Sequence, residues 1–328
     1  MGIVASHSTL MNTHWGSLVD TAPAERFKNG LAAAKEALAQ AKLDSVVLIG
    51  PNHFRGLWLD LMPTFTIGLQ ECTTLGDGGT PNCALDVDTD LAKAICWDLV
   101  EAGFDPAFSL RLEVDHGIAH AVQYLLAGLD VPVVPFIINV FAPPLPSLSR
   151  CEAVGEQIRA AITADGAAKR VAVIASGGLS HQLPFPKWWE PRGSDEELLV
   201  EAWLNGRGRW KEYDARRRRI TLGTKARINP DFDTQVMRWV EAGQMGQLTH
   251  WSSDDLERVG GNGAQEVRTW LAAAAVAAHA PGRQLAYEPI AEWLTGMGVA
   301  IIGGPGSIEP GLVFSTDNFH TATPGESK

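Results

Sequence analysis

Short apolar runs alternate with longer amphipathic segments through the first two thirds of the chain. The apolar runs predict buried strands, at residues 3–6, 45–49, 131–139 and 171–175. The amphipathic segments predict helices, at residues 23–41, 88–102, 117–127 and 151–163. Pro132 and Pro135 place the third strand at a sheet edge or beside a bulge, because proline cannot donate to the strand ladder. The alternation indicates an α/β fold, with a largely parallel sheet flanked by helices in layers.

The C-terminal part of the chain has a different pattern. From about residue 231 onward it predicts helices only, at residues 231–242, 253–259 and 262–280, and the last of these is alanine-rich on all sides and therefore expected to be buried. Residues 206–220, GRGRWKEYDARRRRI, are arginine-rich, which favours a solvated helix face. We expect one catalytic domain at 1–302, with a variable segment at 190–230 and a flexible tail at 303–328.

Composition and charge narrow the classes of partner. A formal net charge of −11 over 328 residues argues against a nucleic-acid backbone, which requires a basic surface. The four cysteines form no C-x-x-C pair, which favours reduced thiols. Neither a secretion signal nor a membrane-spanning apolar stretch is recognisable. The expected location is cytoplasmic, with no nucleic-acid partner and no membrane.

Histidines follow the ends of the predicted strands. His7, His53 and His181 each come shortly after one, and His116 stands just before a predicted helix. Ligands of open α/β sheets bind at the carboxyl ends of the strands. If the strands are parallel, these histidines reach one edge of the sheet, although strand order decides whether they are neighbours. Each alone fits an ordinary loop histidine, but together they favour a shared polar site.

A metal would give such a site a function. Imidazole suits iron, zinc, copper and nickel, and two histidines with one carboxylate form the facial triad that leaves positions open on Fe(II) for a substrate and O2. Glu266 is a candidate carboxylate, since Trp270 and Ala274 make its helix face apolar. The alternative is an early-turn glutamate that interacts with the helix dipole, and spacing alone favours that alternative.

Other motifs carry less weight. His116 and His120 in HGIAH are one helical turn apart, but the glutamate that a zinc protease needs is replaced by Gly117. The glycine-rich segments 76–82 and 303–306 lack the Lys-Ser/Thr of a phosphate-binding loop and are interpreted as turns or linker. A G-x-S-x-G elbow is absent, which disfavours a serine hydrolase of that type.

Several blocks of the chain together resemble one enzyme family. They are SHS near the N-terminus, LIGPNHFRG followed by DLMPTFTIG, VDHGIAHAVQYLL, SGGLSHQ, QEVRTWLAA and YEPIAEWLTGMG. In this order they are similar to the class III (LigB-like) extradiol ring-cleavage dioxygenases, nearest the branch that cleaves 2,3-dihydroxyphenylpropionate. The resemblance runs from about residue 7 to residue 298.

The resemblance implies a fold, a cofactor and a set of roles. The fold would be a single α/β domain around a mixed central sheet. Non-haem Fe(II) would be held by His7, His53 and Glu266, with His181 as catalytic base and His116 as an acid/base and substrate contact. The reaction would be extradiol (meta) cleavage of a substituted catechol by O2, giving a ring-opened semialdehyde-type product in aromatic compound catabolism. The chain is also expected to form a homo-oligomer.

The choice of substrate and two rival functions stay open at this stage. The arginine stretch could bind a carboxylate and the pair Trp188–Trp189 could stack on a second ring, as a biphenyl-type, lignin-derived catechol would require. The simpler explanation, that both features are surface or core residues, is the favoured one. The rival functions are a zinc-dependent hydrolase with the same His/His/Glu site and a non-catalytic binding protein of the same fold.

Overall fold

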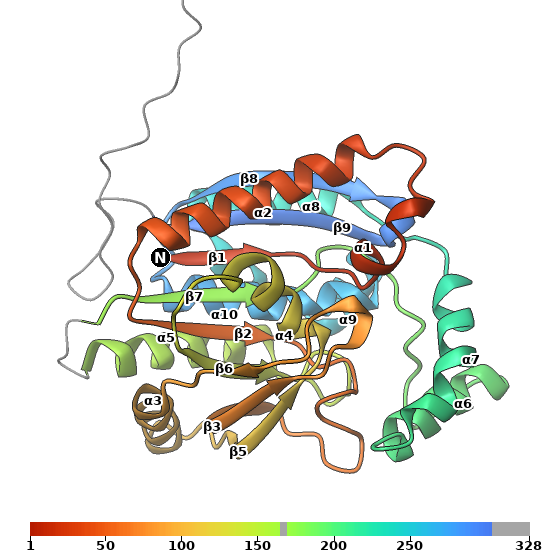
Figure 1. Cartoon of the computed structure of the whole chain (residues 1–328), viewed down its shortest axis with the longest axis horizontal. Coiled ribbons are helices and arrows are strands. Elements are labelled where there is room, and N and C mark those ends of the chain that lie inside the picture. Colours follow the sequence, from red (N-terminus) through yellow and green to blue (C-terminus); the bar gives the residue numbers. More distant parts are fainter. Residues whose placement is uncertain (165–168, 304–328) are drawn as a thin grey trace, which may run out of the picture.

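One mixed sheet runs through the part of the chain that the computed structural model describes, residues 1–164 and 169–303 (Figure 1). Its strand order is β4-β3-β6-β2-β7-β1-β9-β8, with β5 beside β3. The strands are β1 (Gly2–Ala5), β2 (Ser45–Gly50), β3 (Phe65–Thr74), β4 (Ala84–Leu85), β5 (Ala107–Val114), β6 (Val133–Ile138), β7 (Val171–Ser176), β8 (Gly282–Ile290) and β9 (Thr295–Ile302). The parallel core β6-β2-β7-β1 is flanked by antiparallel pairs, which confirms the predicted mixed α/β sheet.

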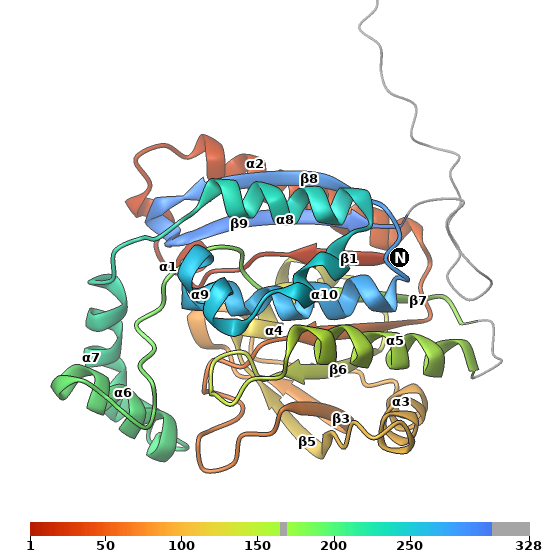
Figure 2. The ribbon, with the colours of Figure 1, turned by 180° about the vertical axis from the view of Figure 1, so that it is seen from behind.

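Helices cover both faces of this sheet, so the central strands are apolar on both sides. In β2, Val46 and Leu48 belong to one core cluster and Val47 and Ile49 to the other. The first cluster lies under α2 (Ala22–Gln40) and α4 (His116–Ala121), and the second under α3 (Thr89–Glu101), α5 (Leu148–Ala164), α8 (Pro230–Ala242) and α10 (Val267–Val276) (Figures 1 and 2).

The prediction of an all-helical C-terminal part is wrong at its end. Strands β8 and β9 form a hairpin there, and β9 pairs with β1 in antiparallel register. Strand β9 is buried along most of its length, which removes the alternation that marks a half-exposed strand. Gly296 and Gly298 also lower its strand propensity, yet both are needed because Asp233 and Leu179 pack against them.

Strand β6 lies inside the sheet, which corrects the prediction of an edge. It pairs with β2 on one side and with β3 on the other. Pro135 is tolerated because the antiparallel pairing of β6 with β3 does not extend past Phe136. The ladder therefore requires no N–H from Pro135. Strand β3 is irregular just there, with a register shift after Gly68. The bulge alternative was therefore the correct one.

The remaining helices surround the carboxyl ends of the parallel strands. They are α1 (Leu10–Thr13), α6 (Gly193–Asn205), α7 (Trp210–Leu222) and α9 (Ser253–Gly260). Figure 1 shows α6 and α7 projecting from the body of the molecule on that side. Two predicted helices are compound: 117–127 is α4 followed by a π-helical turn, and 262–280 is a 3-10 turn (Asn262–Glu266) followed by α10.

Two other expectations concern the chain's environment. The four cysteines are all free thiols. Within the described residues, no helix combines the length and apolarity that crossing a bilayer demands. The predicted tail at 303–328 lies, apart from Gly303, outside the described residues.

Candidate active site

Three parallel neighbours bring the predicted site residues to one edge of the sheet. The order β2-β7-β1 places the loops that follow these strands side by side. His53 follows β2, His181 follows β7 and His7 follows β1. The sequence located these residues at strand ends, and the strand order now shows that they share one site.

His7, His53 and Glu266 meet in the interior. Nε2 of His53 is 2.9 Å from Oε1 of Glu266, and Nε2 of His7 is 3.8 Å from the same oxygen. All three side chains are buried. Two ligands at right angles on one cation, with bonds of about 2.1 Å, lie roughly 3 Å apart. Both distances from Glu266 are therefore compatible with ligands to a single metal ion.

Glu266 is a buried carboxylate that stays ionised. Burial raises the pKa of Glu266, but His7, His53 and His181 outweigh burial and bring this pKa to about 2. The backbone N–H of Gly178 donates to its other oxygen, Oε2. Gly178 leaves room for this contact, because a Cβ there would lie 2.8 Å from Oε2. A buried anion among imidazoles is an environment that favours a cation.

Neighbouring polar groups orient the two histidines. Nδ1 of His7 shares a hydrogen bond of 3.0 Å with the Ser176 hydroxyl, and its Nε2 faces Glu266. The backbone N–H of His53 donates to Oδ2 of Asp115 at 2.5 Å, and Oδ1 of Asp115 lies 3.5 Å from the imidazole Nδ1. Such outer partners fix ring orientation and tautomer in metal sites.

His116 stands next to this group at the start of α4. Its ring centroid is 4.1 Å from that of His53, and its Nδ1 is 2.5 Å from Oδ2 of Asp77. Asp77 belongs to the glycine-rich segment 76–82, which we interpreted from the sequence as a turn or linker. In the structure, this segment supplies the carboxylate that pairs with His116. One nitrogen each from His7, His53 and His116 lie within 4.8 Å of one another, so His116 is a second candidate for the third metal ligand.

His181 lies against the same cluster from another side. Its Nδ1 is 2.9 Å from the carbonyl oxygen of Leu179, so the ring donates there and Nε2 keeps its lone pair. Burial lowers the pKa of His181 below its ordinary value, which leaves the ring neutral at neutral pH. Its backbone is held by Gly260 and Gly263. Unlike His53 and His116, it is not among the described residues that line the adjoining cavity.

Sequence reasoning missed several members of the site. His120 is buried, and its ring stacks on His7 with centroids 5.4 Å apart. Burial and the nearby His116 lower the pKa of His120 to about 3, so it is neutral. Asp115 was recognisable as a helix cap immediately before His116. Asp77 could not be recognised from the sequence, because only the tertiary structure brings its loop to α4.

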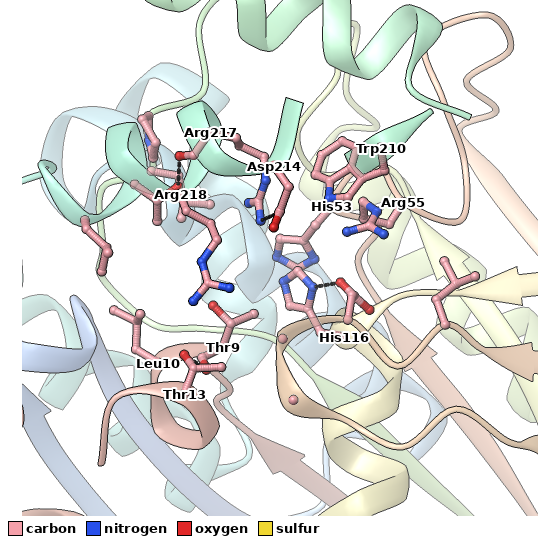
Figure 3. A pocket seen from close by; sticks show the side chains of 18 of the residues that line it. Thr9, Leu10, Thr13, His53, Arg55, His116, Trp210, Asp214, Arg217 and Arg218 are labelled. Carbon is pink, nitrogen blue, oxygen red and sulfur yellow. Dashed lines mark hydrogen bonds and ion pairs between the residues drawn. The ribbon is translucent and has the colours of Figure 1, made fainter. Parts of the chain in front are cut away.

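A cavity of about 460 Å³ opens beside the cluster (Figure 3). His53 and His116 form part of its wall, and Phe185, Trp203 and Trp210 add aromatic surface. Cavities of this size and mixed lining hold small organic molecules. The histidine cluster is thus accessible to a ligand from this side.

The arginine stretch contributes to the cavity, whereas the pair Trp188–Trp189 does not belong to its described lining. The arginine stretch forms most of α7, and Arg219 is exposed, as a solvated helix face requires. Arg217 and Arg218, however, line the cavity. Trp188 and Trp189 are 42% and 50% exposed and lie outside the described lining of the cavity. The surface interpretation therefore holds for the tryptophan pair but only for part of the arginine stretch.

Residues 2–298 match the family model described as the catalytic LigB subunit of aromatic ring-opening dioxygenase. The chain belongs to this family, in agreement with the resemblance of its motifs. Among its relatives, a 2,3-dihydroxyphenylpropionate/2,3-dihydroxicinnamic acid 1,2-dioxygenase from a Rhodococcus species is 37% identical over 281 residues, or 81% of this chain and 87% of the relative. Proteins of the same name from Rhodococcus jostii RHA1 and Escherichia coli K12 are 35% identical, over 90% and 82% of this chain and 95% and 88% of their own.

A solved structure supports the fold independently of sequence. The crystal structure of an uncharacterized protein from Escherichia coli K12 superposes with a TM-score of 0.52, at 12% identity, and covers 92% of this chain and 99% of its own. At this identity the likeness concerns the fold alone. Fold and family together place the chain among aromatic ring-opening dioxygenases, which act on small aromatic molecules.

Proposed function

We propose that the chain is an Fe(II)-dependent extradiol dioxygenase that opens the ring of a substituted catechol with O2 and gives a semialdehyde-type product. The observation that carries the proposal is the ionised, buried Glu266 between the Nε2 atoms of His7 and His53. Two imidazoles and one carboxylate are the facial triad that suits Fe(II). The named relatives open the rings of dihydroxyphenyl acids, which supports the same reaction class here.

The metal and the histidines have separate tasks in this proposal. Iron, held by His7, His53 and Glu266, would bring the catechol and O2 together and favour the ionised catechol. His181 would accept a proton from the catechol, because its low pKa keeps the ring neutral and its Nε2 keeps a lone pair. His116, at the wall of the cavity and paired with Asp77, would hold and return a proton during ring opening.

The direct test uses protein purified without oxygen and supplied with Fe(II). With 2,3-dihydroxyphenylpropionate, hereafter the acid substrate, we expect O2 uptake and a yellow product that contains both atoms of isotopically labelled O2. Because the acid substrate already carries one carboxylate, its extradiol product is itself a dicarboxylate, and a colourless tricarboxylate would indicate intradiol cleavage instead. Bound zinc together with hydrolysis and no O2 uptake would instead support the hydrolase, and inactivity on a broad catechol panel would support a binding protein.

Iron content distinguishes the two candidate ligand sets. Under this proposal His7→Gln and Glu266→Gln lose iron and activity, whereas His116→Gln keeps iron and loses activity. If His116→Gln also lost iron while the fold remained intact, the three-histidine set would be the true one. Circular dichroism and the unfolding temperature of each variant show whether the fold is intact.

A further inference from the structure

The cavity beside the histidines carries more positive charge than its carboxylates neutralise. Its cationic side chains are Arg55, Lys211, Arg217 and Arg218. Its carboxylates are Asp77 and Asp214. Asp77 is already bound to His116, and Asp214 lies 3.2 Å from Arg217. The remaining positive charge faces the space that a ligand would enter.

Arg55 and Arg218 are the two arginines of the described cavity lining without a direct ion pair, although the charges of Asp77, Asp115 and Asp214 act on Arg55 from a distance. Within residues 1–164 and 169–303, neither forms an ion pair with a carboxylate. Nε of Arg55 is buried and has no hydrogen-bond partner among these residues. Arg55 as a whole is half-buried, but a buried donor without a partner is costly unless a ligand satisfies it. Arg218 is an exposed residue, but it extends from α7 into the pocket (Figure 3).

Trp210 packs against two arginines of the cavity. The Arg55 guanidinium lies 4.0 Å from the centre of its ring, and that of Arg217 lies 4.9 Å from it. Stacking on an aromatic face leaves the edge of a guanidinium, with its N–H donors, free to bind a carboxylate through two hydrogen bonds. Trp210 therefore positions Arg55 and leaves the N–H donors of its guanidinium available to a ligand.

One loop supplies both a histidine and an arginine to the cavity. Arg55 is two residues beyond His53, so the segment that follows β2 supplies both a residue of the histidine cluster and a cation of the cavity wall. Helix α7 supplies Arg218 from across the cavity. A ligand whose ring lies at the histidines would carry its substituent toward these two arginines.

We propose that Arg55 and Arg218 bind the carboxylate of an acidic side chain on the catechol ring and so select anionic substrates, with Trp210 as a positioning residue for Arg55. This inference rests on the proposed function, which places the ring at the histidines. A neutral or biphenyl-type substituent would leave the buried Nε–H of Arg55 without an anionic partner. The cavity is therefore matched to the carboxylated class of catechol.

The first experiment compares the acid substrate with its primary amide, which has nearly the same shape and no charge. We expect the parent protein to prefer the acid in kcat/KM, and we expect Arg55→Gln and Arg218→Gln each to reduce the acid-over-amide ratio by about 10- to 100-fold. The matched control is Arg219→Gln, the same change at the next residue of α7, outside the described lining of the cavity. A ratio that stays within twofold of the parent in both variants and in the double variant would refute the proposal.

The second experiment measures binding without catalysis. 3-Phenylpropionate keeps the ring and the carboxylate but lacks the two hydroxyls, so it probes the arginines independently of ring opening. In calorimetric titrations of the full chain we expect binding that weakens about tenfold or more in Arg55→Gln and Arg218→Gln and is unchanged in Arg219→Gln. If the parent opens no catechol yet shows this pattern, the proposed function fails and the carboxylate site stands. Equal binding by the parent and both variants overturns the carboxylate site.

Discussion

At the scale of residues, the site concentrates charge where water is excluded. Glu266 is 1% exposed and His7 5%, so their interaction is not screened by solvent. His181 and His120 have lowered pKa values because burial disfavours the imidazolium. His53 differs from them: although burial opposes the shift, Asp115 and Glu266 raise the pKa of His53 to about 10, so this ring holds a proton that a metal ion would displace.

His181 provides a test of roles within this cluster. We expect His181→Gln to retain iron, because the residue is not among the proposed ligands, and to lower kcat by about 10²- to 10⁴-fold, the usual contribution of general acid–base catalysis. Iron content by elemental analysis and single-turnover rates measure the two effects. Loss of iron from a folded His181→Gln protein would show that the roles are assigned wrongly.

Asp77 provides a second test at this scale. Oδ2 of Asp77 lies 2.5 Å from Nδ1 of His116. This hydrogen bond fixes the tautomer and the direction of the imidazole ring. We expect Asp77→Asn to lower kcat about 10- to 100-fold with little change in iron content. The control is Asp60→Asn, an exposed surface carboxylate in a weak pair with Arg207 at 3.4 Å. Equal activity of Asp77→Asn and the parent would remove Asp77 from the site.

At the scale of elements, the segment from α9 to α10 positions two site residues at once. The carbonyl of Gly260, at the end of α9, accepts from the N–H of His181, and the carbonyl of His181 accepts from the N–H of Gly263. Glu266 follows at the end of the same 3-10 turn. A capping box of Ser252 and Asp255 begins α9. This segment therefore sets the distance between the proposed base and the proposed carboxylate ligand.

Gly263 tests that arrangement. A Cβ at this position would lie 2.2 Å from the ring of His181, so Gly263→Ala must displace the imidazole. Because a misplacement of about 1 Å can reduce a rate 100-fold, we expect kcat to fall by about that factor. Gly16→Ala is the control, since nothing lies within 4 Å of its added methyl group. Full activity in Gly263→Ala would show that the position of His181 is not critical.

At the scale of the whole molecule, one buried carboxylate joins three distant segments. Asp233 in α8 accepts hydrogen bonds from Ser180, next to His181, and from Tyr287 in β8. Burial raises the pKa of Asp233 to about 6, although these hydrogen bonds oppose the shift. The folded protein therefore binds this proton more tightly than the unfolded chain does.

The pH dependence of stability follows from that shift. A raised carboxyl pKa adds stability that is fully present below about pH 4 and is lost as the pH rises through about 6, with a total on the order of 3 kcal/mol. Asp233→Asn cannot titrate, so the free energy of unfolding of the parent minus that of Asp233→Asn should decrease over this range. Urea unfolding at intervals between pH 4.5 and 7.5 measures the difference. A constant difference would contradict the assigned pKa.

Local pattern predicted much of this architecture and part of the site. Strands β1, β2 and β7 and helices α2, α3 and α5 were expected within a few residues, because their burial produces a strong periodic signal. His7, His53 and His181 were recognisable because each follows such a strand. Strands β3, β4, β5, β8 and β9 were missed: β5 exposes Phe108 and Leu110 on its outer face, and β9 is interrupted by glycines. The expected homo-oligomer stays a prediction.

The sequence by itself determined the class of fold, the family and the candidate residues of the site, since apolar runs and the polar residues at their ends are local features of the chain. Only the tertiary structure decided which of these residues meet. The order β2-β7-β1, the approach of Asp77 to His116 and the stacking of Arg55 on Trp210 join residues that are distant in the chain. Such contacts form because burying both faces of the sheet selects one arrangement of the strands, and no short stretch of sequence contains that information.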